Sequence, residues 1–253
     1  MKENIISHNI ENKIAASFSK HARSYDKHAQ LQKSMAERLA SMLPRQFPQR
    51  ITEIGCGTGV FTRHLLTHRT GHLILNDISP VMIGLLRERM ALPADAELVI
   101  GNAEKINFAQ TDLIAANAVF QWFHDPGETL KHLRRSLNPG GELIFSTFGP
   151  GTLQEFRETG SLKSPTVLHS IQEWACMIAA AELILKESHS EFRKTFFPSS
   201  LALTRNLQQI GAAPLQLMDS GGLRKLIRDY DKKFSTAHGV YATWELLYFS
   251  CVC

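Results

Sequence analysis

The sequence has few cysteines and no long apolar run. Its 253 residues include four cysteines, Cys56, Cys176, Cys251 and Cys253, and their number and spacing suit neither a disulfide framework nor a zinc site. No stretch approaches the roughly 20 apolar residues of a transmembrane helix, and the N-terminus lacks the apolar core of a secretion signal. We therefore expect a cytoplasmic protein with reduced thiols that spans no membrane.

The chain also lacks a dense block of charge of one sign. It has 28 basic and 24 acidic residues, a formal charge of +4 and a pI of about 8.9. This mild basic bias favours acidic partners but not nucleic acid, which calls for a basic stripe. The 11 histidines show no metal-ligand spacing, so we expect no metal. The oligomeric state stays open.

Short apolar runs separated by helical patterns dominate the first 150 residues. Such runs are typical of buried parallel strands, and their alternation with helices predicts an α/β fold with helices on both faces of the sheet. The aromatic tail over residues 239–252 favours an antiparallel closing strand. The five predicted parallel strands are 50–56, 72–77, 96–102, 111–118 and 141–148.

We interpret the chain, 1–253, as a single domain in four parts. Residues 1–48 form N-terminal helices that act as a lid, because a helical pattern over 13–43 stops at Pro44 and Pro48. Residues 49–149 form the cofactor-binding core. Residues 150–200 are predicted to be mostly helical, an insertion that covers the substrate, and residues 201–253 complete the sheet.

The loop Glu53-Ile-Gly-Cys-Gly-Thr-Gly59 follows the first predicted strand. Its spacing, Gly55-x-Gly57-x-Gly59, differs from the G-x-G-x-x-G of dinucleotide sites, and no lysine marks a nucleotide P-loop. A carboxylate at Glu53 would repel a diphosphate and favour a cation. S-adenosylmethionine, which has a sulfonium and an amino group but no phosphate, fits such a loop.

Polar residues end the next strands, where ligands bind in open parallel sheets. Asp77 ends the second strand and suits both ribose hydroxyls, although NAD sites use the same device and a helix cap is an alternative. Asn102, Ala103 and Glu104 end the third strand, where an amide side chain and a backbone N–H suit the adenine edge. Asn117 ends the fourth.

This joint pattern resembles class I S-adenosylmethionine-dependent methyltransferases, with Asn102 where that superfamily usually has Asp. From about residue 13 to the end, the chain further resembles the malonyl-acyl-carrier-protein O-methyltransferase family of biotin synthesis. The segments that carry this resemblance are Phe18-x3-Ala22-x2-Tyr25-Asp26-x2-Ala29-x2-Gln32, Gln121-Trp122, "FSTFGPGTLQEF" (145–156), "LTRNLQQIGA" (203–212) and "GVYATWELLYF" (239–249).

The resemblance implies a Rossmann-like, mostly parallel seven-stranded sheet and methyl transfer to the free carboxylate of a malonyl thioester. A carboxylate is already ionised at neutral pH, so we expect no general base, only placement and exclusion of water. Tyr25, Gln121 and Arg205 are the expected catalytic residues, with Tyr25 and Arg205 as clamps for the carboxylate. The expected cofactor contacts are Phe18, Tyr25, Gln32, Glu53, Gly55, Gly57, Gly59, Asp77, Ile78, Asn102, Ala103, Glu104, Asn117 and Trp122.

Acyl carrier proteins are acidic, so the resemblance also implies a basic docking patch. The expected patch is Arg224, Lys225, Arg228, Lys232 and Lys233, of which Lys225, Arg228 and Lys232 share a helical face. Three other functions compete with this one. They are a methyltransferase of another small carboxylic acid such as trans-aconitate, a non-catalytic S-adenosylmethionine-binding protein, and a nicotinamide reductase.

Overall fold

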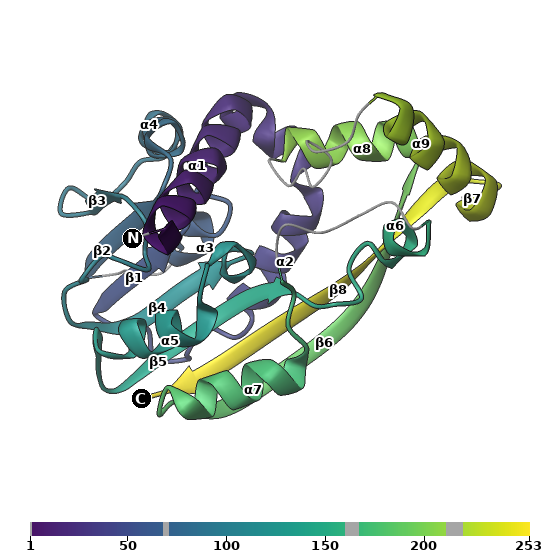
Figure 1. Ribbon diagram of the computed structural model, residues 1–253. Helices are drawn as coiled ribbons and strands as arrows, with labels where there is room; N and C mark the ends of the chain where they lie inside the picture. The colour runs from purple at the N-terminus through teal and green to yellow at the C-terminus, as the bar shows by residue number, and fades with distance from the viewer. Residues whose placement is uncertain (1, 68–70, 160–166, 211–219) are drawn as a thin grey trace.

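One mixed sheet organises the chain in the computed structural model, which describes residues 2–67, 71–159, 167–210 and 220–253 (Figure 1). The strand order is β3-β2-β1-β4-β5-β8-β6, with the short β7 paired to β8. The strands are β1 (Arg50–Ile54), β2 (His72–Asp77), β3 (Glu97–Ile100), β4 (Thr111–Asn117), β5 (Leu137–Phe148), β6 (Ile184–Phe197), β7 (Ser235–Thr236) and β8 (Gly239–Val252).

The sheet confirms the predicted class I methyltransferase fold. Strands β1 to β5 pair in parallel, while β8 runs antiparallel to β5 as its alternating, aromatic sequence predicted. The strand order reverses between β1 and β4. From β1 the chain continues to β2 on one side of this point, and from β4 it continues to β5 on the other side. In such sheets the carboxyl ends of the strands at this reversal form the ligand-binding edge.

The prediction of a mostly helical segment over 150–200 is wrong for its last third. Residues 184–197 form β6, which pairs antiparallel with β8 along its length. The burial of β6 alternates from residue to residue between Ser188 and Phe197, which is the period of a strand rather than of a helix. The sequence pattern also predicts a helix over 126–137 that ends at a turn, Asn138-Pro139-Gly140-Gly141. In the structure this helix, α5 (Pro126–Arg134), ends three residues earlier and those four residues lie within β5.

Side-chain chemistry sets several helix starts. Ser79 and Asp125 cap α4 and α5, each followed by proline at the first helical position, and Ser170 forms a capping box with Glu173 at α7. The helices are α1 (Lys2–His28), α2 (Gln30–Ala40), α3 (Thr62–Leu66), α4 (Pro80–Arg89), the 3-10 helix η1 (Phe120–Trp122), α5 (Pro126–Arg134), α6 (Gln154–Glu158), α7 (Ile171–Ala180), α8 (Ser200–Gln209) and α9 (Ser220–Phe234). None of these described helices is long and apolar enough to cross a membrane.

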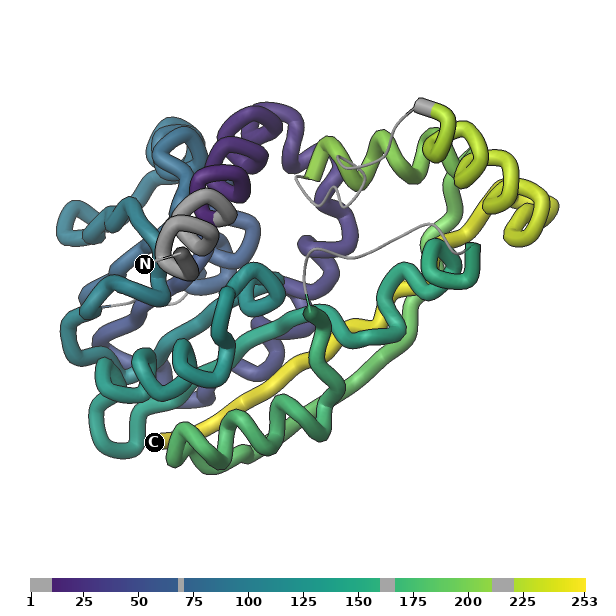
Figure 2. Tube along the Cα trace, in the orientation of Figure 1, coloured from purple at the N-terminus to yellow at the C-terminus, as the bar shows by residue number. Residues whose placement is uncertain are grey.

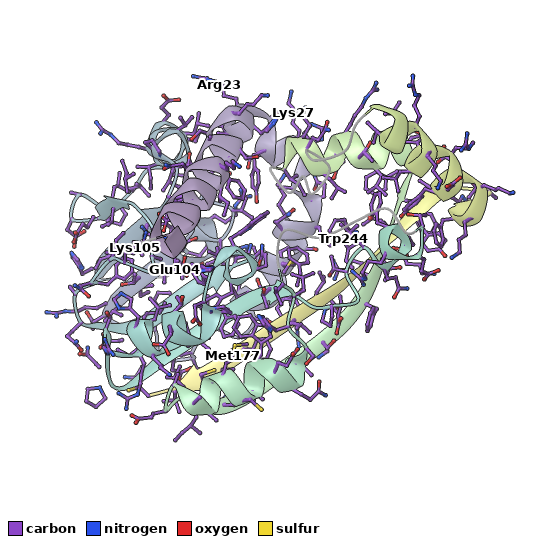
Figure 3. All side chains as sticks on the ribbon, viewed as in Figure 1. Arg23, Lys27, Glu104, Lys105, Met177 and Trp244 are labelled. Carbon is purple, nitrogen blue, oxygen red and sulfur yellow. The ribbon has the colours of Figure 1, made fainter. Side chains whose placement is uncertain are left out.

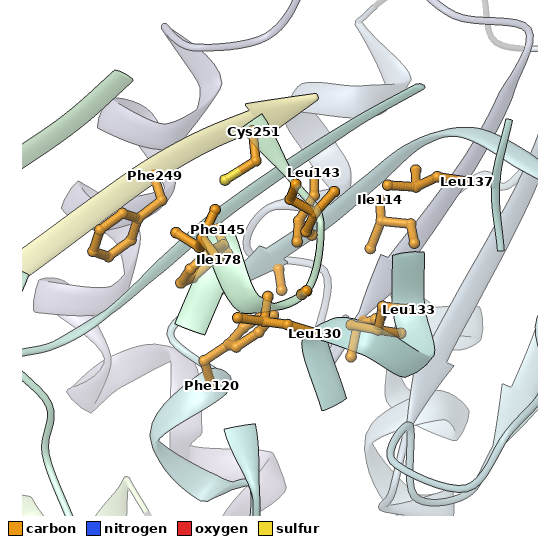
Figure 4. Close-up of a cluster of buried hydrophobic side chains, with 14 of the residues drawn as sticks. Ile114, Phe120, Leu130, Leu133, Leu137, Leu143, Phe145, Ile178, Phe249 and Cys251 are labelled. Carbon is orange, nitrogen blue, oxygen red and sulfur yellow. The ribbon is translucent and has the colours of Figure 1, made fainter. Parts of the chain in front are cut away.

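Both faces of the sheet are buried by apolar side chains. On one face, α5 and α7 cover a cluster that includes Phe120, Phe145, Ile178 and Phe249 (Figure 4). The Phe145 ring stacks between those of Phe120 and Phe249, at centroid distances of 4.1 and 4.8 Å. On the other face, α2, α3 and α4 bury alternate residues of the same strands. This two-sided burial explains why β1, β2 and β4 read as continuous apolar runs.

Strands β6 and β8 continue as a ribbon beyond the end of β5 (Figure 2). Helices α6, α8 and α9 pack there around a second apolar cluster that includes Phe156, Leu203, Tyr230 and Trp244. The buried Glu155 of α6 joins this unit to β8, since its carboxylate accepts from the Thr243 amide at 3.1 Å and from the Thr243 hydroxyl. Helix α6 is therefore tied to the ribbon.

Replacing Glu155 with alanine should destabilise the protein by about 2 kcal/mol or more, because it leaves a buried amide and hydroxyl without an acceptor. Urea unfolding followed by circular dichroism measures the loss. Gln154→Ala, at the exposed neighbouring position, is the matched control and should change stability by less than about 0.5 kcal/mol. Equal stability of the two variants would show that Glu155 does not anchor α6.

Candidate active site

The glycine loop forms a tight turn between β1 and α3 at the reversal of strand order. Gly55, Gly57 and Gly59 have φ angles of +66°, +55° and +91°, a region that other residues rarely adopt. A side chain at Gly55 would collide with Val119, which follows β4. The loop therefore needs glycine both for its backbone angles and for its close approach to the neighbouring strand.

Asp77, at the end of β2, is bonded to this loop. Its Oδ2 accepts from the Gly57 amide at 2.9 Å and its Oδ1 from the Ser79 amide at 2.8 Å. Burial raises the pKa of Asp77 to about 6, against the lowering effect of these two bonds. The hydroxyl that caps α4 belongs to Ser79, so Asp77 is not the cap. Ile78 lies between them and is partly buried.

Glu53 is buried below the loop rather than exposed to a ligand. Its carboxylate accepts from the Thr62 hydroxyl at 2.7 Å and its side chain is almost fully buried. Burial, and then the nearby charge of Asp77, raise the pKa of Glu53 to about 8, although the Thr62 bond opposes the shift. The sequence argument treated Glu53 as charged. In this structure it holds its proton at neutral pH.

The loop after β3 is held by two carboxylates. The Asn102 amide donates to Glu11 of α1 and, at 3.2 Å, to Glu104, while its oxygen accepts from the Glu104 amide at 3.0 Å. Glu104 also accepts from the backbone of His124 at 2.9 Å, and Ala103 is buried. These residues lie together as the sequence predicted, with the Asn102 side chain engaged inside the protein.

At the end of β4, Asn117 links three elements. Its amide donates to the Gln32 carbonyl of α2 at 3.0 Å, and its oxygen accepts from Ser146 of β5 at 2.8 Å. The Gln32 side chain is 8% exposed, and its Oε1 is a buried acceptor without a partner. Such an atom calls for a donor. The ammonium group of S-adenosylmethionine is a donor of this kind, so the residues present fit that cofactor.

Aromatic side chains from α1 and η1 meet above this edge. The Phe18 ring lies 5.5 Å from that of Trp122 and 6.4 Å from that of Tyr25, both in edge-on geometry. Gln121 is oriented by two bonds, from its Nε2 to the Ala118 carbonyl at 2.7 Å and from Thr147 to its Oε1 at 3.2 Å. Helix α1 thus contacts η1 through Phe18, and a lid role for residues 1–48 stays a prediction.

Asp26 is a residue of the site that the sequence reasoning quoted but did not assign. Its carboxylate accepts from the Thr58 hydroxyl of the glycine loop at 2.6 Å and from Arg89 of α4 at 2.9 Å. Ser19, two turns before Asp26 on α1, bonds to Ser79 at 2.8 Å. The adjacency of Asp26 to Tyr25 in the motif was the only signal in the sequence.

Arg205 and the predicted basic patch are not brought to this edge. Arg205 is exposed on α8, on the side away from the buried Leu203 and Leu207. On α9, Lys233 pairs with Glu158 of α6 at 2.8 Å. Among the described residues, no group of three or more His, Cys, Asp or Glu side chains is arranged to hold a metal ion.

The raised pKa of Glu53 predicts that the protein loses stability between about pH 4.5 and 8. The folded state holds the proton over that range while the unfolded state releases it, so the free energy of unfolding falls as the pH rises. Glu53→Gln removes this contribution and should reduce the loss between pH 5.5 and 8 by about 3 kcal/mol. Urea unfolding at both pH values measures it.

Glu88→Gln, at an exposed position of α4, is the control and should keep the wild-type pH dependence. A Glu53→Gln variant with the same pH dependence as the wild type would show that Glu53 is ionised in the folded protein.

Comparison with known proteins agrees with this geometry. A family model described as a methyltransferase domain matches residues 25–217. A putative methyltransferase from Bacillus halodurans has a similar structure, with a TM-score of 0.66 and 15% identity, covering 86% of this chain and 97% of that one. At that identity the likeness concerns the fold alone.

Two relatives of higher sequence identity share one name. A malonyl-[acyl-carrier protein] O-methyltransferase of a Paenibacillus species is 31% identical over 250 residues, 86% of this chain and 89% of the relative. A protein of that name from Priestia megaterium is 31% identical over 259 residues, 92% and 94% of the two chains. The glycine loop, the buried acceptors at the strand ends and these matches agree, and the chain belongs to the malonyl-[acyl-carrier protein] O-methyltransferase family of methyltransferase-domain proteins.

Proposed function

We propose that the protein transfers a methyl group from S-adenosylmethionine to the free carboxylate of a malonyl thioester on acyl carrier protein, an early step of biotin synthesis. The observation that carries the proposal is a pair of buried acceptors: Asp77, which is bonded to the glycine loop, and the unpartnered Oε1 of Gln32, whose backbone meets Asn117 at the end of β4. The relatives' shared name supplies the substrate. We place this activity in the cytoplasm.

The cofactor, when bound, supplies a methyl group on a sulfonium, which a nucleophile accepts as the sulfonium becomes a thioether. We propose that Asp77 holds its ribose hydroxyls and that Gln32 accepts from its ammonium group. The loop residues Gly55, Gly57 and Gly59 allow its close approach, and Ile78, Asn102, Ala103 and Glu104 line the adenine side. Phe18 and Trp122 close the site from above and exclude water.

The malonyl carboxylate needs donors rather than a base. Burial, and then the charges of Asp77 and Asp26, raise the pKa of Tyr25, so its hydroxyl stays protonated and can donate to a carboxylate. Gln121 is fixed by Ala118 and Thr147 and has a second amide hydrogen for the same acceptor. We propose Tyr25 and Gln121 as the residues that orient the acceptor.

The carrier-protein partner is part of the proposal. Lys225, Arg228 and Lys232 are exposed on α9, as the sequence pattern predicted, and form a basic face there. Lys233 is held by Glu158, and Arg228 lies 3.7 Å from Asp229. Among the described residues, Arg224, Lys225 and Lys232 of the expected patch are exposed and form no ion pair with Asp or Glu.

Transfer of labelled methyl from S-adenosylmethionine tests the function. Malonyl-acyl carrier protein should become labelled, and mild base should release the label as expected for a methyl ester. Trans-aconitate and malonyl-coenzyme A serve as parallel acceptors. Label on trans-aconitate alone would move the function to a small-acid methyltransferase, and S-adenosylhomocysteine binding without turnover of any acceptor would indicate a non-catalytic binding protein.

Asp26→Ala should weaken S-adenosylhomocysteine binding roughly tenfold, because it removes the contacts that hold α1 on the glycine loop. Isothermal titration calorimetry measures the affinity. Asp26→Asn keeps an acceptor for Thr58 and should lose less of the affinity for S-adenosylhomocysteine. The control, Asp95→Ala in an exposed loop, should bind like the wild type. If the Asp26→Ala variant bound S-adenosylhomocysteine as tightly as the wild type, the attachment of α1 to the glycine loop would not contribute to cofactor binding.

A further inference from the structure

The outer side of α1 is a basic stripe. Its exposed positions from residue 13 onward are Lys13, Ala16, Lys20, Arg23 and Lys27, at alternating spacings of three and four that place them on one face of the helix. Figure 3 shows Arg23 and Lys27 at the outer edge of the molecule, on the side of α1 away from the sheet. The opposite face carries Phe18, Ala22 and Tyr25, which pack against Met82 and Leu85 of α4.

From residue 13 onward, α1 carries one carboxylate beside this stripe. Residues 13–28 contain a single acidic residue, Asp26, whose side chain is bonded to Thr58 and Arg89 below the helix. Within the described ranges, none of Lys20, Arg23 and Lys27 forms an ion pair with Asp or Glu. Their charges therefore act on whatever approaches α1 from solvent.

Helix α8 extends the same surface. It packs against the end of α1, where Ser24 bonds to Gln209 at 2.9 Å and His28 lies 3.5 Å from Asn206 (Figure 1). Its exposed side presents Leu201, which is 38% exposed, and Arg205 one turn later. The sequence of α8 contains no acidic residue. A basic stripe next to an exposed apolar side chain is typical of a protein-binding surface.

We propose that the outer faces of α1 and α8, through Lys20, Arg23, Lys27, Leu201 and Arg205, form the main docking surface for the acidic carrier protein. The inference rests on the proposed function and deepens it. The charge is complementary, and α1 places the surface beside the site because its other face carries Phe18 and Tyr25. It also accounts for the exposure of Arg205, which contacts the carrier here rather than the malonyl carboxylate.

Docking at this place couples the partner to the site. The helix that presents the basic stripe outward presents Phe18 and Tyr25 inward, so a carrier bound to α1 is positioned over the residues that orient the acceptor. The basic face of α9 lies further along the same side, because α9 packs on α8. It extends the surface and is expected to contribute less.

The test compares three paired charge reversals. Lys20→Glu with Lys27→Glu changes α1, and Lys225→Glu with Arg228→Glu changes α9. Arg45→Glu with Arg135→Glu is the control, since both residues are exposed at the amino edge of the sheet, just before β1 and β5. For each protein, fluorescence anisotropy measures binding of labelled holo-acyl carrier protein at 50 and 300 mM salt, and kinetics give KM for malonyl-acyl carrier protein and malonyl-coenzyme A.

The α1 variant should bind the carrier roughly tenfold more weakly and lose most of the salt dependence. Its KM should rise for the carrier substrate much more than for malonyl-coenzyme A, with unchanged affinity for S-adenosylhomocysteine. The control should behave like the wild type, and the α9 variant should show a smaller loss.

Carrier binding by the α1 variant equal to that of the control would overturn the proposal, and so would equal losses on both malonyl substrates. Binding of the wild type to phosphatidylserine vesicles in place of the carrier, lost in the α1 variant, would also overturn it by making the stripe a membrane surface. Failure of the wild type to methylate the carrier substrate would instead refute the proposed function, while the anisotropy measurement still decides the docking surface.

Discussion

The hydrogen bond between the Gly57 amide and the Asp77 carboxylate joins the two strands on which the site depends. It requires a backbone with positive φ at Gly57 and a buried acceptor at the end of β2. Burial raises the pKa of that acceptor to about 6, and its two backbone bonds limit the shift. The loop and the end of β2 are therefore organised before any ligand arrives.

Helix α1, which lies over this edge of the sheet, is attached to the same glycine loop. Asp26 joins α1 to Thr58, which lies between Gly57 and Gly59 of the motif, and to Arg89 of α4. Phe18 and Tyr25 then lie above the strand ends, while α2 brings Gln32 to Asn117. One helix carries both the inner aromatic residues and the outer basic stripe, so the proposed acceptor placement and the proposed carrier docking would share one element.

Burial also changes the ionisation state of a carboxyl group. Glu53 was expected to attract a cation, yet its pKa of about 8 leaves it protonated below the loop. Its bond with Thr62 connects β1 to α3. In the proposed function, the acceptors for a positively charged cofactor are instead Gln32 Oε1 and Asp77.

Local sequence alone determined the parallel core, the closing strand and the glycine loop. Apolar runs, glycine spacing and strand-ending polar residues report conditions that each segment meets by itself. Tertiary structure decided the rest. β6 is a strand because β8 supplies its hydrogen bonds, Arg205 is exposed because Leu203 and Leu207 bury the other side of α8, and Asp26 matters because Thr58 and Arg89, distant in sequence, meet it. Long-range pairing and burial are properties of the folded chain, and no local pattern encodes them.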